Sequence, residues 1–252
     1  MRREERMSAI LERLADGEPV GVAELSKEFR VAPATIRRDL VMLEGQRLLV
    51  RTHGGAVAHA VSYELPLRYK GVRHAEEKRR IAREAASLVE EGMAVGLTGG
   101  TTTTEVARTL ADRPGLTVVT NALNIAAELA VRPNLKLVVT GGVARSNSYE
   151  LSGPLTEASL GALNLDIMFA GVDGISVGAG CTTHQDVEAH SNGAMIERAK
   201  KVVVVADSSK IGRVAFARIC DLSAVDELIT DTAAGPEPVR KLADAGVRVV
   251  LV

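Results

Sequence analysis

Two patterns in the sequence predict an α/β chain of two domains. Near the N-terminus, short segments with helical spacing precede a strand-like run that contains a glycine pair. From residue 76 onward, apolar helices alternate with short strands that carry almost no polar residues. Such strands are buried on both faces, which is typical of a mainly parallel sheet covered by helices. We therefore expect a small N-terminal domain at 1–57, a linker at 58–75 and an α/β domain at 76–252.

Three short helices are expected in the N-terminal domain. The first is marked by apolar residues at helical spacing, namely Met7, Ile10, Leu11 and Leu14. The second carries Val22, Leu25 and Phe29. The third begins near Pro33, because proline suits the first turn of a helix. Only three residues separate the second helix from the third, so the pair predicts a helix-turn-helix.

The stretch VAPATIRRDL places two adjacent arginines on the third helix. Ile36 and Leu40 stack on one side of this helix, whereas Thr35, Arg37 and Arg38 point elsewhere. The second helix of a helix-turn-helix enters the DNA major groove with its N-terminal residues at base edges. An arginine there can hydrogen-bond guanine O6 and N7 together. A solvated charged face is the alternative explanation for the pair.

The run RLLVRTHGGAV, after the third helix, predicts the wing of a winged helix-turn-helix. Residues at its tip are positioned to contact phosphate or the minor groove. Between Lys27 and His53 there are six basic residues and three acidic ones, whereas the whole chain has a net charge of −1. Basic charge therefore gathers where DNA would lie. The candidate DNA-binding residues are Thr35, Arg37, Arg38, Arg51 and His53.

Several classes of protein are disfavoured by the sequence. No apolar run approaches a membrane span, and the opening MRREER is followed by no apolar signal segment. The two cysteines, Cys181 and Cys220, lack CxxC spacing, so neither a disulfide scaffold nor a cysteine zinc site is expected. We expect a cytoplasmic protein without cofactor or metal. A metal site in THQDVEAH is possible by spacing, although a solvated helix face is the commoner explanation of such residues.

Six strands are expected in the second domain. They are MAVGL (93–97), LTVVT (116–120), LKLVVT (135–140), DIMFAGV (166–172), KVVVVA (201–206) and VRVVLV (247–252). In an open parallel sheet, ligands bind beyond the carboxyl ends of the strands.

Polar residues gather after five of these strands, in TGGTTTT, TNA, TGG, GVDG and ADSSK. Glycines let backbone approach a ligand, while threonine hydroxyls, helix N-terminal N–H groups and a lysine suit phosphate. Aspartate and asparagine suit sugar hydroxyls. Each group alone is explained by a helix cap, a tight turn or a solvated side chain, but the set predicts a phosphorylated sugar as ligand. The candidate effector-binding residues are Thr98, Gly99, Gly100, Thr101, Thr102, Thr103, Asn121, Gly141, Gly142, Asp173 and Lys210.

Over residues 5–57, TIRRDL followed by RTHGGA resembles the DeoR family of bacterial transcriptional regulators. Over residues 76–232, GGTTTTEVA, VVTNALNIA, VTGG, FAGVDGI, ADSSK and LITD resemble the sensor domain of that family. The resemblance implies a repressor that binds double-stranded operator DNA as a homo-oligomer, a dimer or a tetramer, and that a phosphorylated sugar or related metabolite releases from the operator.

The chain departs from the family pattern at five positions. The family usually has serine at Ala32, a small residue at Arg30 and glycine at Arg47. Basic residues are frequent in the family where Asn192 and Gly193 stand.

The sensor fold of the family is similar to ribose-5-phosphate isomerase, and ADSSK with Asp173-Gly174 resembles its active site. An isomerase needs a carboxylate base and further acids, but this chain continues ISVGAG without a second acidic pair. We therefore expect binding without turnover. The alternatives are an isomerase with an accessory DNA-binding domain, or a plain interaction module with an unoccupied site.

Overall fold

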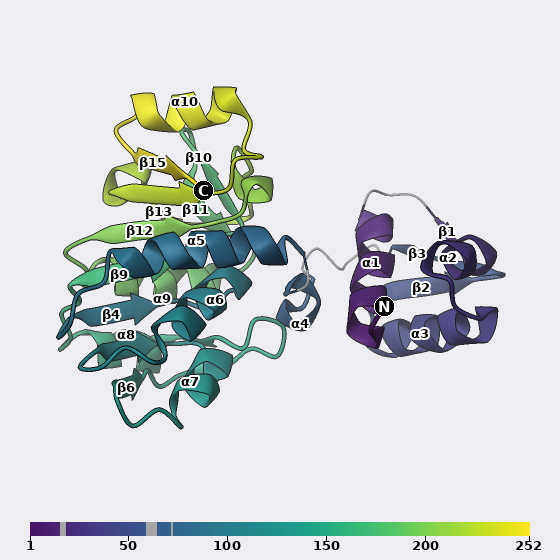
Figure 1. Cartoon of the computed structure of the whole chain (residues 1–252), viewed down its shortest axis with the longest axis horizontal. Helices are drawn as coiled ribbons and strands as arrows, with labels where there is room; N and C mark the ends of the chain where they lie inside the picture. Colours follow the sequence, from purple (N-terminus) through teal and green to yellow (C-terminus); the bar gives the residue numbers. More distant parts are fainter. Residues whose placement is uncertain (16–18, 59–64, 72) are drawn as a thin grey trace. The chain divides into compact units, whose positions relative to one another are not determined.

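The computed structural model describes residues 1–15, 19–58, 65–71 and 73–252 (Figure 1). The chain divides into two compact units, Met1–Arg73 and His74–Val252. None of the helices in these described ranges is long and apolar enough to cross a membrane.

The first unit contains the three predicted helices, α1 (Arg3–Ala15), α2 (Val22–Phe29) and α3 (Pro33–Gly45). The predicted wing is the hairpin of β2 (Leu49–Thr52) and β3 (Gly55–Ala58). The core is formed by the residues that gave the helical spacing, among them Ile10, Leu25, Ile36, Leu40 and Leu43. The predicted helix-turn-helix and wing are thus confirmed.

A third strand, β1 (Val20–Gly21), was not predicted and pairs with β3. A Cβ atom added at Gly55 would lie 2.0 Å from the carbonyl oxygen of Val20. The second glycine of the wing tip is therefore required by the close approach of β1.

The segment expected as a linker contains a helix of the first unit, α4 (Leu67–Lys70). Tyr69 is buried, and its carbonyl oxygen accepts a hydrogen bond of 2.6 Å from the hydroxyl of Ser8 on α1. Residues 59–64 and 72, which include His59 of the expected linker, lie outside the described residues.

The second unit is built on a seven-stranded sheet of order β15-β14-β12-β9-β4-β5-β6, and every pair in it is parallel. All six predicted strands are present, as β4 (Ala94–Leu97), β5 (Thr117–Thr120), β6 (Lys136–Val139), β9 (Ile167–Ala170), β12 (Val202–Val205) and β15 (Arg248–Leu251). The predicted mainly parallel sheet is confirmed.

The sequence analysis was incomplete in two respects. It missed β14 (Glu227–Thr230), which lies between β12 and β15. It was also wrong that every strand is buried on both faces, because β6 and β15 are the edge strands and are partly exposed.

Helices cover both faces of the sheet (Figure 1). One face packs against α5 (Ala75–Ser87), α6 (Thr101–Leu110) and α7 (Leu123–Leu129), and the other against α8 (Pro154–Leu160), α9 (Asp186–Ile196) and α10 (Pro236–Asp244). Along β9, Ile167 and Phe169 pack on the first face, while Met168 and Ala170 pack on the second. Both sets are apolar because both faces are covered.

Shorter elements extend the second unit. A small antiparallel sheet contains β10 (Gly174–Ser176), β11 (Gly180–Thr183) and β13 (Ala217–Cys220), and a two-stranded ladder joins β7 (Val143–Ala144) to β8 (Leu151–Ser152). The 3-10 turns η1 (Ser208–Lys210) and η2 (Leu222–Ala224) follow β12 and β13. Cys181 and Cys220 are register partners across β11 and β13, and both are free thiols.

Candidate functional site

Helix α3 is held in place by an ion pair that sequence analysis missed. Nε of Arg6 donates to Oδ2 of Asp39 at 2.5 Å and Nη2 donates to Oδ1 at 3.2 Å. Both side chains are buried. Asp39 therefore faces α1 and does not contribute a negative charge to the outward face of α3.

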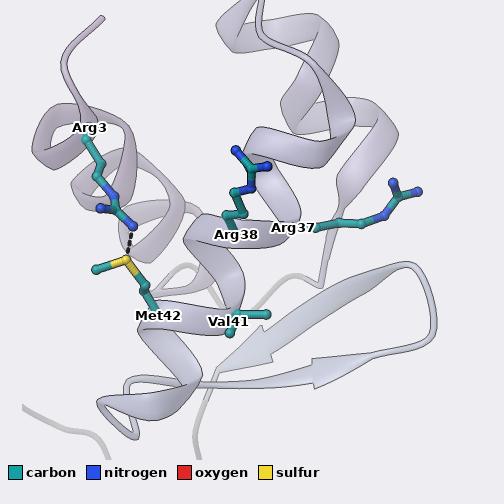
Figure 2. Close-up of a pocket in the computed structure, with 5 residues that line it drawn as sticks. All are labelled: Arg3, Arg37, Arg38, Val41 and Met42. Carbon is teal, nitrogen blue, oxygen red and sulfur yellow. Dashed lines mark hydrogen bonds between the residues drawn. The ribbon is translucent and has the colours of Figure 1, made fainter.

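The outward face of α3 carries the arginine pair. Arg37 and Arg38 are exposed and point in different directions, and together with Arg3, Val41 and Met42 they line a shallow hollow (Figure 2). Arg3 donates a hydrogen bond to the sulfur of Met42. The exposed Val41 and Met42 are apolar surface of the kind that contacts thymine methyl groups. This face thus offers guanidinium donors and apolar surface, two kinds of group that are suited to reading bases in the major groove.

The wing presents its two predicted residues to solvent. His53 lies at the tip beside Gly54, whose φ of 94° is left-handed. Arg51 is exposed and lies 3.3 Å from a carboxylate oxygen of Glu44 on α3. This ion pair ties the wing to α3. Thr35, in the first turn of α3, is partly buried.

Arg30 and Arg47, two of the positions where the chain differs from the family pattern, both have left-handed backbone conformation. Arg30 ends α2 with φ 54°, and Arg47 precedes β2 with φ 57°. The turns thus keep the geometry for which glycine is suited, at a steric cost of about 1 kcal/mol for each side chain. Ala32 is the N-cap residue of α3 and has no side-chain acceptor to offer its first N–H groups.

In the second unit, the candidate effector site lies at the carboxyl ends of the strands of the main sheet. There, Gly100 is the N-cap residue of α6 and has a φ of 136°. The backbone N–H groups of Thr101, Thr102 and Thr103 have no hydrogen-bond partner among the described residues. Three such N–H groups at a helix N-terminus are suited to binding an anion.

Not all of the predicted threonines are available for a ligand. The hydroxyl of Thr98 donates to Gly99 O at 3.2 Å and accepts from Gly171 N at 2.9 Å. The hydroxyl of Thr103 donates to Gly100 O at 3.0 Å. The contact with Gly171 joins the ends of β4 and β9, whereas the other two lie within the segment that follows β4. Among the predicted threonines, the hydroxyls of Thr101 and Thr102 therefore stay available for a ligand.

Asp173 and Lys210 come together as neighbours. Nζ of Lys210 lies 3.6 Å from Oδ1 of Asp173, and the hydroxyl of Thr183 donates to Oδ2 at 3.0 Å. Nε2 of His184 lies 3.8 Å from the same carboxylate. Lys210 is 25% exposed, which makes it a lysine of the site rather than a fully solvated one.

Asp207, close to Lys210 in the chain, is also influenced by nearby lysine charges. Burial raises the pKa of this carboxyl, but the hydrogen bond from Ser209 and the charges of Lys78 and Lys210 outweigh burial and lower the pKa overall. Asp207 is therefore ionised, and it shares the lysine charges that a phosphate would use.

Asn121 belongs to a buried cluster with two residues that were not predicted to bind ligand. Its Nδ2 lies 3.0 Å from Oδ1 of Asn192 and 3.3 Å from Oε2 of Glu150. Asn192 Nδ2 donates to the same Oε2 at 3.1 Å. A Cβ atom at Gly99 would lie 2.3 Å from Cγ of Glu150, so Gly99 lies directly against this side chain. The cluster thus adjoins the loop before α6.

Gly141 and Gly142 face other parts of the unit. The hydroxyl of Thr156 donates to Gly141 O at 2.5 Å, and a Cβ atom at Gly142 would lie 2.9 Å from the backbone of Ser152. Close packing against α8 and β8 accounts for Gly142, whereas a Cβ atom at Gly141 would lie at an ordinary contact distance of 3.7 Å from Leu155.

Within the described ranges, the structure forms no group of three or more His, Cys, Asp or Glu residues that could hold a metal ion. His190 is exposed on α9 and His184 lies beside Asp173.

Comparison with known families matches both units. Residues 6–60 match the DeoR-like helix-turn-helix domain, and residues 73–232 match the DeoR C terminal sensor domain.

Similar proteins extend over nearly the whole chain. The chain is 38% identical over 247 residues to the HTH-type transcriptional regulator GlpR of Haloferax volcanii, covering 98% of this chain and 96% of GlpR. It is 32% identical over 239 residues to the glycerol-3-phosphate regulon repressor of Escherichia coli K12, covering 95% and 94%. It is 34% identical over 232 residues to the transcriptional repressor AccR of Agrobacterium fabrum, covering 91% and 90%.

Solved structures are more distant. Ribose 5-phosphate isomerase A from Methanocaldococcus jannaschii is 22% identical, covers 54% of each chain and gives a TM-score of 0.41. The sorbitol operon regulator SorC from Klebsiella pneumoniae is 12% identical, covers 82% of this chain and 89% of its own, and gives a TM-score of 0.35. Similarity at this level does not bear on function.

Proposed function

Because the chain belongs to the DeoR family of transcriptional regulators, we propose that it is a repressor that a phosphorylated sugar or related metabolite releases from its operator. The observation that carries the proposal is the outward arginine pair of α3, on a helix that Arg6 and Asp39 lock to α1. A rigid helix with exposed guanidinium groups is suited to reading base edges in the major groove.

On the DNA side, Arg37 and Arg38 contact bases, with Thr35 at the start of the same helix. Arg51 and His53 on the wing contact phosphate or the minor groove. One small module gives limited affinity, so we propose that a homo-oligomer, a dimer or a tetramer, engages two half-sites about one helical turn or a multiple apart.

On the effector side, the N–H groups of Thr101 to Thr103 bind the phosphate with the hydroxyls of Thr101 and Thr102, and Lys210 adds positive charge. Gly99 and Gly100 let the ligand approach the backbone, and Asn121 and Asp173 bind sugar hydroxyls. Induction requires the effector to prefer the state that does not bind DNA, and a tenfold preference supplies about 1.4 kcal/mol. We propose that this regulation takes place in the cytoplasm.

Sugar-phosphate isomerisation is the alternative, since Asp173 and Lys210 lie together at the carboxyl ends of the strands. We favour binding without turnover, because no second acidic pair follows Asp173-Gly174. Incubation of pure protein with ribose 5-phosphate tests this. Ketose formation that Asp173→Asn abolishes would establish the enzyme instead.

The main test is operator release. Operator duplexes are selected from a random library with the full-length protein, and their release is followed by fluorescence anisotropy. Glycerol 3-phosphate, fructose 6-phosphate and ribose 5-phosphate are added separately. Release by at least one ester, with no release by inorganic sulfate, supports the proposal. Failure to select any duplex contradicts the DNA-binding role, and failure of every ester to bind in calorimetry contradicts the sensing role.

A further inference from the structure

Glu150 immediately precedes β8, and its carboxyl lies against Gly99 and Asn121, two of the residues expected to bind the effector. Only 6% of the residue is exposed. Its Oε2 accepts from Asn121 and Asn192, whereas Oε1 has no hydrogen-bond partner within the described part of the chain. Asn121 is fully buried, and its Oδ1 also lacks a partner among the described residues. Buried polar atoms are nearly always paired, so the unpaired Oδ1 of Asn121, beside a carboxyl oxygen of Glu150 that is also left without a partner in the described part of the chain, indicates a ligand that supplies the missing contacts.

The charged groups facing Glu150 come from three elements. Glu188 on α9 and Asp173 after β9 are acidic, and Arg145 after β7 forms an ion pair with Glu188. No basic side chain of the described residues forms an ion pair with Glu150 itself. Burial, followed by the charges of Glu188 and Asp173, raises the pKa of Glu150 to about 8, although the two asparagine hydrogen bonds lower it. At neutral pH most of the molecules therefore carry a proton on this carboxyl.

We propose that Glu150 is a specificity-determining residue, which as a neutral acid donates a hydrogen bond to a hydroxyl group of the effector, while Asn121 accepts another. This inference rests on the proposed function. A Cβ atom at Gly99 would lie 2.4 Å from Oε1 of Glu150, so the carboxyl lies against the loop that introduces α6. A carboxylate there would repel the phosphate bound at that helix N-terminus, whereas a neutral acid binds beside it and recognises a polyol.

The pH dependence follows from this arrangement. The second pKa of a phosphate monoester is about 6, so the ligand is fully ionised above neutral pH. An acid with a pKa of about 8 is about 90% ionised at pH 9, and affinity should then fall about tenfold between pH 7 and pH 9. Glu150→Gln keeps a donor without a titrating proton, so its affinity should stay within about twofold over the same range.

Calorimetric titrations of the full-length protein test the inference with two probes, glycerol 3-phosphate and n-propyl phosphate. The wild type should prefer the polyol ester and lose about tenfold affinity at pH 9. Glu150→Gln should keep the preference without the pH dependence, and Glu150→Ala should lose the preference. Glu157→Gln, an exposed glutamate on α8, is the matched control and should behave as the wild type.

Three results would overturn the inference. One is a fall in affinity at pH 9 that persists in Glu150→Gln, and another is a polyol preference that persists in Glu150→Ala. The third is an infrared difference spectrum, wild type minus Glu150→Gln at pH 7, that shows an ionised carboxylate instead of the carbonyl band of a protonated acid. This third measurement needs no ligand, so it separates failure of the inference from failure of the proposed function. Absence of binding by both esters would contradict the proposed function and this inference together.

Discussion

Replacement of Lys210 by alanine should make the repressor harder to induce without weakening it on the operator. The ammonium group lies 3.6 Å from Asp173 and is 25% exposed, so part of its charge is already balanced and part is solvated. A charge-assisted hydrogen bond is worth about 1.5 to 3 kcal/mol, and competition from Asp173 places the loss at the lower end. The dissociation constant of the effector should therefore rise about tenfold.

The assay measures operator release against concentration of the phosphate ester, in parallel with the affinity for DNA in its absence. Lys200→Ala is the matched control, because Lys200 is 74% exposed and pairs with Asp166, which precedes β9 at the opposite end of the strands. The control should release DNA at the wild-type effector concentration. If Lys210→Ala does the same, or binds the operator poorly without effector, Lys210 is not part of the phosphate site.

Three further predictions concern the other parts of the molecule. Arg37→Ala or Arg38→Ala should weaken operator binding by about 1 to 3 kcal/mol in a mobility-shift titration. Loss of sequence preference would indicate a base contact, whereas a weaker dependence of the binding constant on salt concentration would indicate a phosphate contact. Unchanged binding by both variants would contradict the DNA-reading role. Ala32→Ser should add a side-chain cap to α3, and Arg47→Gly should remove the steric cost of a side chain at a left-handed φ. Each should raise the free energy of unfolding, measured in urea, by up to about 1 kcal/mol. A lower free energy of unfolding in both variants would show that the turn geometry differs from the one described. The pKa of Glu150 is raised from 4.5 to about 8 in the folded state, so folding binds a proton between these values and the free energy of unfolding should fall by about 1.4 kcal/mol per pH unit. Glu150→Gln should reduce this slope, and an equal slope in the wild type and the variant would show that the carboxyl is ionised in the folded state.

Strand prediction rested on the clearest pattern where burial on both faces leaves only apolar residues. Every residue of β9 and β12 is buried, and none is polar. It failed for β14, whose first residue is Glu227. That carboxyl is buried beside Lys201 at 2.8 Å, so a long-range ion pair makes a charged residue acceptable in the sheet. A pattern of apolar residues along the chain carries no information about such a partner.

The candidate site was predictable where the position of a residue follows from the topology. The carboxyl ends of parallel strands lie at one edge of a sheet, so Gly100, Asn121, Asp173 and Lys210 could be grouped from the sequence alone. Glu150 could not, because it approaches the site from the β7–β8 ladder and not from a strand of the main sheet. Arg6 and Asp39 were hidden in the same way, since their contact joins residues 33 positions apart on two helices.

The departure from the family at Asn192 and the protonated state of Glu150 are two aspects of one arrangement. Asn192 donates to Oε2 of Glu150 and accepts from Asn121, so a residue at this position faces the carboxyl directly. A lysine or arginine there would form an ion pair, lower the pKa of Glu150 and hold it as a carboxylate, which can only accept hydrogen bonds. Asparagine leaves the buried carboxyl without a balancing charge, and burial then favours the neutral acid. In the proposed site, asparagine at this position therefore leaves Glu150 able to donate a hydrogen bond, which suits a hydroxyl group of the ligand.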